Sequence, residues 1–214
     1  RLISQIATEC RMPLCYGGGI KTLEQAKKII GLGVEKLAIS SAALNDHKII
    51  HDIANEVGSQ SISVVLDVKK KLFGGYEVFT HSGTKRLKKN PFDLIPEIEN
   101  MGAGEIIINS IDQDGKMRGY DLNLAKKMVD IAANANADAV KFQAFRTEHL
   151  ILSNIEKAPY QIKNTGSEQS QSEMLKRLEL KNEYYKELKN YCDNKKIDFL
   201  ITPFDEISLQ ELEE

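Results

Sequence analysis

Short runs of apolar, β-branched residues alternate along the chain with longer amphipathic stretches. This alternation is typical of repeated βα units around a parallel sheet. The expected strands are 13–16, 36–39, 61–67, 105–109, 139–142 and 198–201. The expected helices are 22–32, 46–57, 92–101, 122–134, 169–178 and 182–194. This spacing fits a (βα) barrel or an open doubly wound sheet. A complete barrel has eight units, so the predicted fold class is α/β, an incomplete (βα)-barrel (TIM-barrel) type of about six units.

Composition and charge restrict the classes of protein to which the chain can belong. The chain has 214 residues, 42% hydrophobic and 28% charged, which is enough to bury a sizeable core. The formal net charge of −2 gives no basic field, so nucleic acid is not an expected partner. No signal peptide or apolar run of membrane-spanning length is visible, and we expect no membrane association. The first and last residues lie in helical patterns without start or stop signals, so we expect both ends to continue.

Cysteine and histidine usage predicts no metal site and no cofactor. The three cysteines, Cys10, Cys15 and Cys192, are an odd number without metal-ligand spacing, which favours a reducing cytoplasmic location. The histidines are more simply read as solvated or packed residues, because only His47 and His51 are spaced four residues apart as on one helix face.

The residues that follow the first two expected strands suit anion binding. Gly17, Gly18 and Gly19 come directly after a strand and before a helix that starts near Thr22. Backbone N–H groups of such a loop can approach a phosphate, and the helix N-terminus adds a favourable dipole. A tight turn that needs positive φ is the alternative. Ser40 and Ser41 stand at the next strand end, where a simple helix-capping role is equally compatible.

Two further strand ends carry carboxylates. Asp67 ends an apolar run and could act as a general acid or base, with a solvated turn residue as the alternative. Asp112, Asp114 and Gly115 follow the fourth strand and could present amides and carboxylates to a polar ligand, or form a structural or calcium-like turn. Because such polar residues recur at four successive strand ends, we expect them to line one common site at the C-terminal face of the sheet.

These motifs carry a specific resemblance. The runs PLCYGGGIKTLEQAKKIIGLGVEKLAISSAAL, SVVLDVKK, YEVFTHSG and GAGEIIINSIDQDGKMRGYD resemble the cyclase subunit of imidazole glycerol phosphate synthase over residues 1–121. The resemblance implies a phosphorylated small-molecule substrate, a glutaminase (HisH-like) partner and an ammonia-using lyase activity. It assigns roles as follows: Asp67 catalytic; Gly18, Gly19, Ser40, Ser41, Asp114 and Gly115 phosphate-binding; Lys36 and Glu105 at the ammonia gate.

Departures from the family pattern concern the substrate. The pair Ser40-Ser41 stands where the family has Asn-Thr, and Lys116 replaces a usual Thr. With Asn109-Ser110, these residues are more similar to the relatives encoded with surface-sugar genes than to the histidine-pathway enzyme. The family's other catalytic aspartate belongs to a first strand that this sequence does not contain, so we expect little turnover from these 214 residues alone.

The remaining residues, 122–214, resemble a different barrel family. ADAVKFQAF, APYQIKNTGSEQSQSEMLKRLEL and KKIDFLITPFD are similar to the N-terminal part of the sialic acid (N-acetylneuraminate) synthases. The resemblance implies condensation of phosphoenolpyruvate with an N-acetyl sugar. It places Lys141 at the phosphoenolpyruvate carboxylate, Gln143 and Asn164 at the sugar, and Thr202 with Phe204 at the same mouth. A lysine inside an apolar strand is costly unless it meets an anion, although a snorkelling side chain is the alternative.

Both resemblances meet in the expected helix 122–134, which predicts two partial barrels joined within one helix. The chain could therefore be a cyclase-like enzyme, a synthase-like enzyme, or an inactive fused fragment that only binds phosphate anions. Open sheet edges predict a homo-oligomer.

Overall fold

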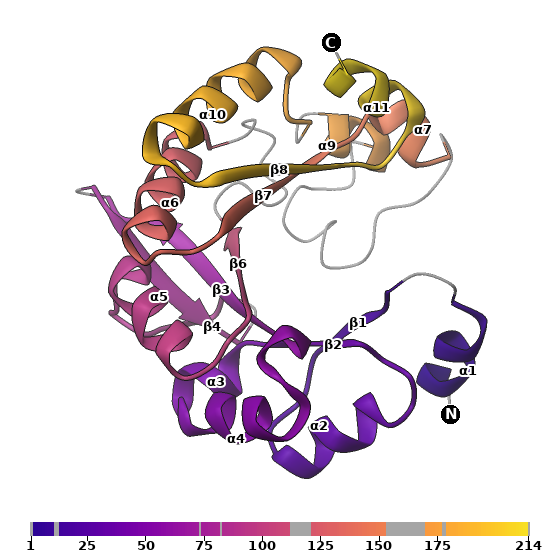
Figure 1. The fold of residues 1–214 in the computed structure, drawn as a ribbon, viewed down its shortest axis with the longest axis vertical. Helices are drawn as coiled ribbons and strands as arrows, with labels where there is room; N and C mark the ends of the chain where they lie inside the picture. The colour runs from indigo at the N-terminus through magenta and orange to yellow at the C-terminus, as the bar shows by residue number, and fades with distance from the viewer. Residues whose placement is uncertain are drawn as a thin grey trace. The chain divides into compact units, whose positions relative to one another are not determined.

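The chain forms two compact units, Arg1–Ile111 and Asp112–Glu214 (Figure 1). The computed structural model describes residues 2–10, 13–72, 74–81, 83–111, 121–152, 170–176 and 179–213. Among these residues the strands form two separate sheets rather than a closed barrel. The expected α/β class with parallel strands is confirmed.

The first unit alternates strands and helices as the sequence predicts. Its strands are β1 (Cys15–Gly17), β2 (Lys36–Ile39), β3 (Ile62–Lys70), β4 (Tyr76–Thr80), β5 (Lys85–Arg86) and β6 (Glu105–Ser110). Its helices are α1 (Leu2–Glu9), α2 (Leu23–Ile30), α3 (Ser41–Asn45), α4 (Lys48–Val57), the 3₁₀ turn η1 (Ser59–Ser61) and α5 (Pro91–Asn100). β1, β2, β3 and β6 are parallel neighbours in that order. Four of the predicted βα strands therefore share one sheet.

The two faces of this sheet differ. Helices α2, α4 and α5 cover one face (Figure 1), where Leu37, Val64 and Leu66 are fully buried. The strand register places alternate residues on the opposite face, because successive side chains of a strand point to opposite sides. Cys15, Lys36, Ser63, Asp67, Glu105 and Asn109 all share that opposite face. The candidate residues of β1, β2, β3 and β6 thus lie on the face opposite α2, α4 and α5.

The β3–β4–β5 hairpin was not predicted. Asp67 was expected to end its strand, but β3 continues to Lys70 and pairs antiparallel with β4, which pairs in turn with β5. Gly74 and Gly75 at φ 93° and 77° turn the chain back. The alternation in YEVFT and the two glycines were the available signals. These signals were missed because the lysines after Asp67 are typical of a solvated loop.

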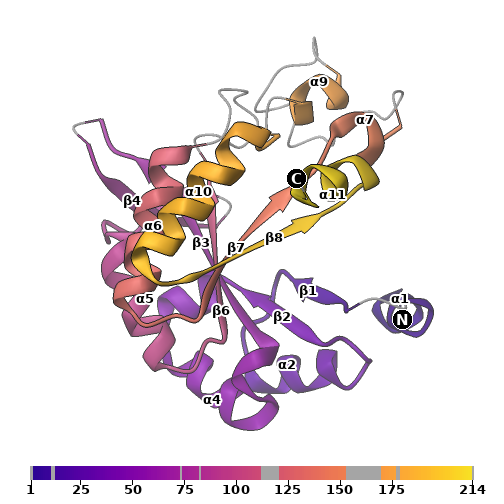
Figure 2. The ribbon, with the colours of Figure 1, turned by 45° about the horizontal axis from the view of Figure 1, so that its top comes forward.

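The second unit is built on a two-stranded parallel sheet. Its elements are α6 (Leu122–Asn134), β7 (Ala139–Ala144), α7 (Thr147–Leu150), α9 (Gln171–Lys176), α10 (Asn182–Lys195), β8 (Asp198–Pro203) and α11 (Glu206–Glu213). α6 and α10 pack on one face of β7 and β8 (Figure 2), where Phe142 contacts Phe199 at 5.5 Å between ring centroids. Helix α6 has the predicted bounds, since the Asp121 side chain caps it by accepting a bond from the Leu124 N–H.

Candidate functional site

The glycine loop after β1 offers an open backbone. Gly18 and Gly19 have φ angles of 102° and 75°, and a Cβ built on either would meet no atom within 4 Å. Both the turn interpretation and the anion interpretation remain compatible with this geometry. Thr22 caps α2 by accepting a hydrogen bond from the Gln25 N–H at 3.3 Å, so the first turn of α2 is ordered next to the loop.

A pocket of about 230 Å³ lies between this loop and α2. Its lining residues are Tyr16, Gly18, Gly19, Ile20, Gln25, Lys28 and Ile29. Lys28 supplies a cation that was not predicted from the sequence. Its position one turn into the helix after a glycine loop was the available signal, since such a residue can turn back toward the loop.

Ser40 and Ser41 occupy the start of α3, at the end of β2. The alternative of a simple capping role is wrong for Ser40, because its side chain makes no capping hydrogen bond although it stands at the N-cap position. The Ser41 hydroxyl instead accepts a bond at 3.2 Å from the backbone N–H of His81, which follows β4. This bond links the end of β2 to the β3–β4–β5 hairpin.

Asp67 lies within a strand, so its interpretation as a solvated turn residue is wrong. The side chain is half-buried, and its Oδ1 accepts a hydrogen bond from Asn109 Nδ2 at 2.9 Å. The two residues face each other in the β3–β6 register. An amide that donates to one carboxylate oxygen fixes the orientation of the carboxyl group, which a general acid or base requires.

The opposite ends of the same strands carry an ion pair. Lys36 Nζ lies 2.6 Å from Glu105 Oε2, and the fully buried Ser63 donates to the same oxygen at 2.8 Å. The Cys15 thiol is close by, since Cys15 pairs with Lys36 in the sheet register. Burial raises the pKa of Cys15, Glu105 adds to the increase and Lys36 opposes it. The structure therefore brings together the two residues predicted for the ammonia gate and adds Ser63.

In the second unit, the predicted ligand residues share the exposed face of the β7–β8 sheet. Lys141 and Gln143 alternate with the buried Phe142 and Ala144, and Gln143 pairs in register with Thr202. Phe204 follows two residues later and is 49% exposed. The sequence suggested that Lys141 would be buried in an apolar strand, at a cost in free energy unless it met an anion. In the structure this cost does not arise, because the Lys141 side chain is exposed.

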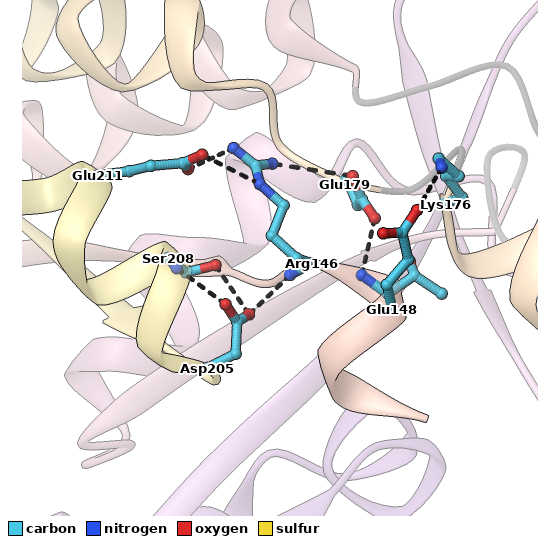
Figure 3. A network of polar contacts seen from close by, with 8 residues as sticks. Arg146, Glu148, Lys176, Glu179, Asp205, Ser208 and Glu211 are labelled. Atoms are coloured by element: carbon cyan, nitrogen blue, oxygen red, sulfur yellow. Dashed lines mark hydrogen bonds and ion pairs between the residues drawn. The ribbon is translucent and has the colours of Figure 1, made fainter. Parts of the chain in front are cut away.

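A polar network that was not predicted from the sequence lies where β7 and β8 end (Figure 3). The Arg146 guanidinium forms ion pairs with Glu211 and, at 3.8 Å, with Glu179. Its backbone N–H donates to Asp205 at 2.7 Å. The bonds to Glu211 chiefly raise the pKa of Arg146 against the opposing effect of burial. The network therefore joins the start of α11 to the segments before α7 and α10.

Asp205 and Tyr185 complete the surroundings of Arg146. Burial acts to raise the pKa of Asp205, but the bonds from the backbone of Ser208 and Arg146 outweigh it and lower the pKa overall. Burial raises the pKa of Tyr185, whose hydroxyl has no hydrogen-bond partner among the described residues. The motif ITPFD contained the signal for the Asp205 cap, because an aspartate directly before a helical run is a preferred N-cap.

Some of the predicted site residues lie in segments that the structure does not describe. A metal site and a membrane-spanning helix were searched for in the described segments. Asp112, Asp114, Gly115, Lys116 and Asn164 lie outside the described residues. Over the described residues, no group of three or more His, Cys, Asp or Glu side chains could hold a metal ion. His47 lies 3.8 Å from Glu97, and His51 is 3.7 Å from Asp52. In the same part of the chain, no helix has both the length and the apolar character needed to cross a membrane.

Comparison with known proteins finds two families, whose models match overlapping parts of the chain. Residues 128–214 match the model of the NeuB family. Over 127 residues the chain is 55% identical to the Vibrio vulnificus protein named "Putative imidazole glycerol phosphate synthase subunit hisF3", covering 59% of this chain and 49% of that protein. It is 52% identical over 132 residues to a similarly named HisF protein of Leptospira borgpetersenii, with 61% and 52% covered.

A more distant relative is the imidazole glycerol phosphate synthase subunit HisF of Sulfurisphaera tokodaii, which is 37% identical over 147 residues, 67% of this chain and 59% of that protein. The chain thus spans about half the length of the curated relatives that it matches. The model of the family described as histidine biosynthesis protein matches residues 1–138, and the chain therefore belongs to that family.

Proposed function

We propose that the first unit is the core of an ammonia-using, cyclase-like lyase that acts on a phosphorylated ribosyl or sugar-type substrate. The observation that carries this proposal is the distribution of groups on one sheet. The glycine loop, Ser40 and the carboxyl of Asp67 lie toward the ends of parallel neighbouring strands, while the Lys36–Glu105 ion pair of 2.6 Å lies at their beginnings. Phosphate anchors and a proton-transfer group on one side, with a charged gate on the other, suit delivery of ammonia to an anchored substrate.

In this proposal each group has a separate role. The backbone at Gly18 and Gly19, with Lys28 nearby, would hold one phosphate, and Asp67 held by Asn109 would move a proton on the bound substrate. Asp114 and Gly115 would hold the other phosphate. Lys36 and Glu105 would admit ammonia from a glutaminase (HisH-like) partner. The Ser40-Ser41 pair leaves histidine-pathway and surface-sugar substrates as the two classes to compare.

The phosphate anchor is tested by titrating the chain with inorganic phosphate and following the amide NMR signals of the glycine loop. We expect Gly19→Ala to weaken binding, because the added methyl group occupies the space that an oxygen needs. Gly33→Ala is the matched control, since Gly33 also has a positive φ of 94° but lies outside the pocket. Equal weakening in both variants would mean that backbone strain, and not the anchor, accounts for the loss.

The catalytic role of Asp67 separates the lyase from a chain that only binds phosphate. Asp67→Asn should leave phosphate binding unchanged while it removes the small turnover, with ammonium as the nitrogen source, that is expected of these 214 residues. A typical general acid or base contributes about 10²- to 10⁴-fold to the rate. If the variant and the parent chain both bind phosphate without turnover, the interpretation as an inactive, phosphate-binding fusion takes its place.

A second candidate function rests on the second unit. Lys141, Gln143 and Thr202 share one exposed sheet face, and Gln143 is in direct register with Thr202. This arrangement supports a synthase-like site that binds phosphoenolpyruvate and an N-acetyl sugar. Phosphoenolpyruvate added to the chain should shift the amide signals of β7, and Lys141→Gln should abolish that shift. We also propose that the two partial barrels are joined within α6, residues 1–121 belonging to one and 122–214 to the other.

A further inference from the structure

The turn between β4 and β5 carries a histidine in an unusual backbone conformation. His81 directly follows β4 and has a φ of 54°, in the left-handed region that residues other than glycine rarely adopt. Its carbonyl oxygen accepts two hydrogen bonds from Thr84, one from the hydroxyl at 2.7 Å and one from the N–H at 3.3 Å. Backbone held in such a sparsely populated region is enriched at ligand-binding and active sites. The conformation therefore makes His81 a candidate site residue.

This turn lies beside the residues that are proposed to hold the substrate. At the end of β2, the Ser41 hydroxyl accepts a bond from the His81 N–H at 3.2 Å. On the other side of the turn, a Cβ built on Gly83 would lie 2.9 Å from the Cδ1 atom of Ile111, which directly follows β6. β2 and β6 are the parallel neighbours of β3, the strand that contains Asp67. The turn therefore reaches from the end of one neighbour of β3 to the end of the other.

The imidazole ring of His81 is held by one nitrogen and leaves the other accessible. Nδ1 lies 3.0 Å from the hydroxyl of Thr80, a fully buried residue. The Thr80 hydroxyl donates its hydrogen to the Lys85 carbonyl at 3.5 Å, so it accepts from the Nδ1–H of His81. Nδ1 therefore keeps its hydrogen in both the neutral and the protonated ring, and only Nε2 differs between them. His81 is exposed, and its Nε2 has no partner among the residues that the structure describes.

We propose that His81 is a specificity-determining residue whose Nε2 atom binds a hydroxyl group on the sugar part of the substrate. A hydroxyl can donate to Nε2 of the neutral ring or accept from Nε2–H of the protonated ring, whereas an ionised phosphate oxygen only accepts. The bond to Ser41 places His81 next to one of the proposed phosphate anchors, where the carbon chain of an anchored sugar phosphate begins. The inference rests on the proposed lyase function and deepens it, because it adds a contact to the sugar between the anchor and Asp67.

Calorimetric titration of the full 214-residue chain with ribose 5-phosphate and, separately, with inorganic phosphate tests this proposal. His81→Asn removes the ring but keeps a residue that adopts the left-handed conformation readily, so the turn should survive. The variant should raise the dissociation constant for ribose 5-phosphate about five- to tenfold, as for the loss of one hydrogen bond, and that for inorganic phosphate less than about twofold. His51→Asn is the matched control, since His51 is an exposed histidine of α4, and it should change neither constant.

The comparison of the two ligands separates a contact with the sugar from a contact with phosphate. Equal weakening for both ligands would assign His81 to the phosphate group, and an unchanged constant for ribose 5-phosphate would exclude any contact, so either result overturns the proposal. His81→Gly also suits a positive φ and must behave as His81→Asn does, which excludes an effect of the new amide. In the parent chain, the imidazole NMR signals of His81 should shift with ribose 5-phosphate and not with inorganic phosphate.

Failure of the proposed function gives a different result. A parent chain that binds neither ligand would contradict the phosphorylated sugar-type substrate, and the role of His81 would be excluded with it. A parent chain that binds both ligands, with no effect of the His81 variants, would exclude the role of His81 alone.

Discussion

The environment of Ser63 differs from what its position in the sequence indicates. This residue stands in an apolar strand and is fully buried, yet its hydroxyl donates to Glu105 Oε2 at 2.8 Å. Glu105 accepts from Lys36 on the same oxygen at 2.6 Å. A buried hydroxyl that donates to a carboxylate orients it, because such charge-assisted bonds are short and directional. Ser63 is therefore a positioning residue for the ion pair at the beginnings of the strands.

Replacing Ser63 should weaken this arrangement measurably. We expect Ser63→Ala to lower the free energy of unfolding by about 1–2 kcal/mol, since the bond to a charged group is lost inside the sheet. In a double-mutant cycle with Glu105→Gln, measured by denaturant unfolding, the two losses should not add. Additivity within about 0.3–0.5 kcal/mol would indicate that Ser63 and Glu105 act independently.

At the scale of elements, the start of α11 shows how a helix is fixed at a strand end. Asp205 Oδ1 accepts from the Ser208 N–H at 2.8 Å, and Oδ2 accepts from the Arg146 N–H at 2.7 Å. One side chain thus caps α11 and holds the residue that follows β7. Figure 3 shows Arg146 reaching Glu211 on the next turns of the same helix.

The cap should make the second unit sensitive to acid. The pKa of Asp205 is lower in the folded chain than its ordinary value of 3.8, so its stabilisation is complete above that value and is lost as the pH falls through the folded-state pKa. Asp205→Ala should cost about 1–2 kcal/mol near neutral pH, as for other N-caps, and less in strong acid. Thermal unfolding followed by circular dichroism in neutral buffer and in strong acid gives the comparison. A loss that is the same under both conditions would exclude a contribution from the carboxylate charge.

At the scale of the whole molecule, unpaired strand edges are the feature that bears on self-association. Among the described residues, β1 pairs only with β2, and β8 pairs only with β7. β8 also presents Leu200, which is 50% exposed, and Phe204 follows it on the surface. An edge with exposed apolar side chains can pair with another chain, because its backbone N–H and C=O groups lack partners in the sheet.

We therefore predict that the 214-residue chain forms homo-oligomers. Light scattering over a dilution series should show a mass that decreases with dilution, and Leu200→Lys should shift the chain toward the monomer because charge blocks edge pairing. Leu72→Lys is the matched control, since Leu72 is 92% exposed in the hairpin and not at either edge. A stable monomer at micromolar concentration, with the amides of β8 protected from hydrogen exchange, would contradict the prediction.

Local sequence pattern was enough to predict the α/β class, the parallel strands and most helix bounds. Helix α6 matches its predicted range because Asp121 caps it and its apolar residues recur at helical spacing. The motifs around Gly19 and Asp67, and those around Lys141 and Thr202, also pointed from local residues alone to the two families whose models match parts of the chain. These features depend on near neighbours in the chain, so a linear pattern contains them.

Strand order and register settled which distant groups meet. Lys36 and Glu105 are 69 residues apart, and Arg146 and Glu211 are 65 apart, so their contacts depend on how the strands pair. The extension of β3 past Asp67 likewise depends on pairing with β4, which turned an expected loop lysine, Lys69, into part of a pocket. Local pattern predicts that a residue is in a strand, but only the partner strand decides which side chains it faces. That is why the catalytic candidate Asp67 was visible in the sequence, while Ser63, the Arg146 network and the hairpin pocket that contains Lys69 were not.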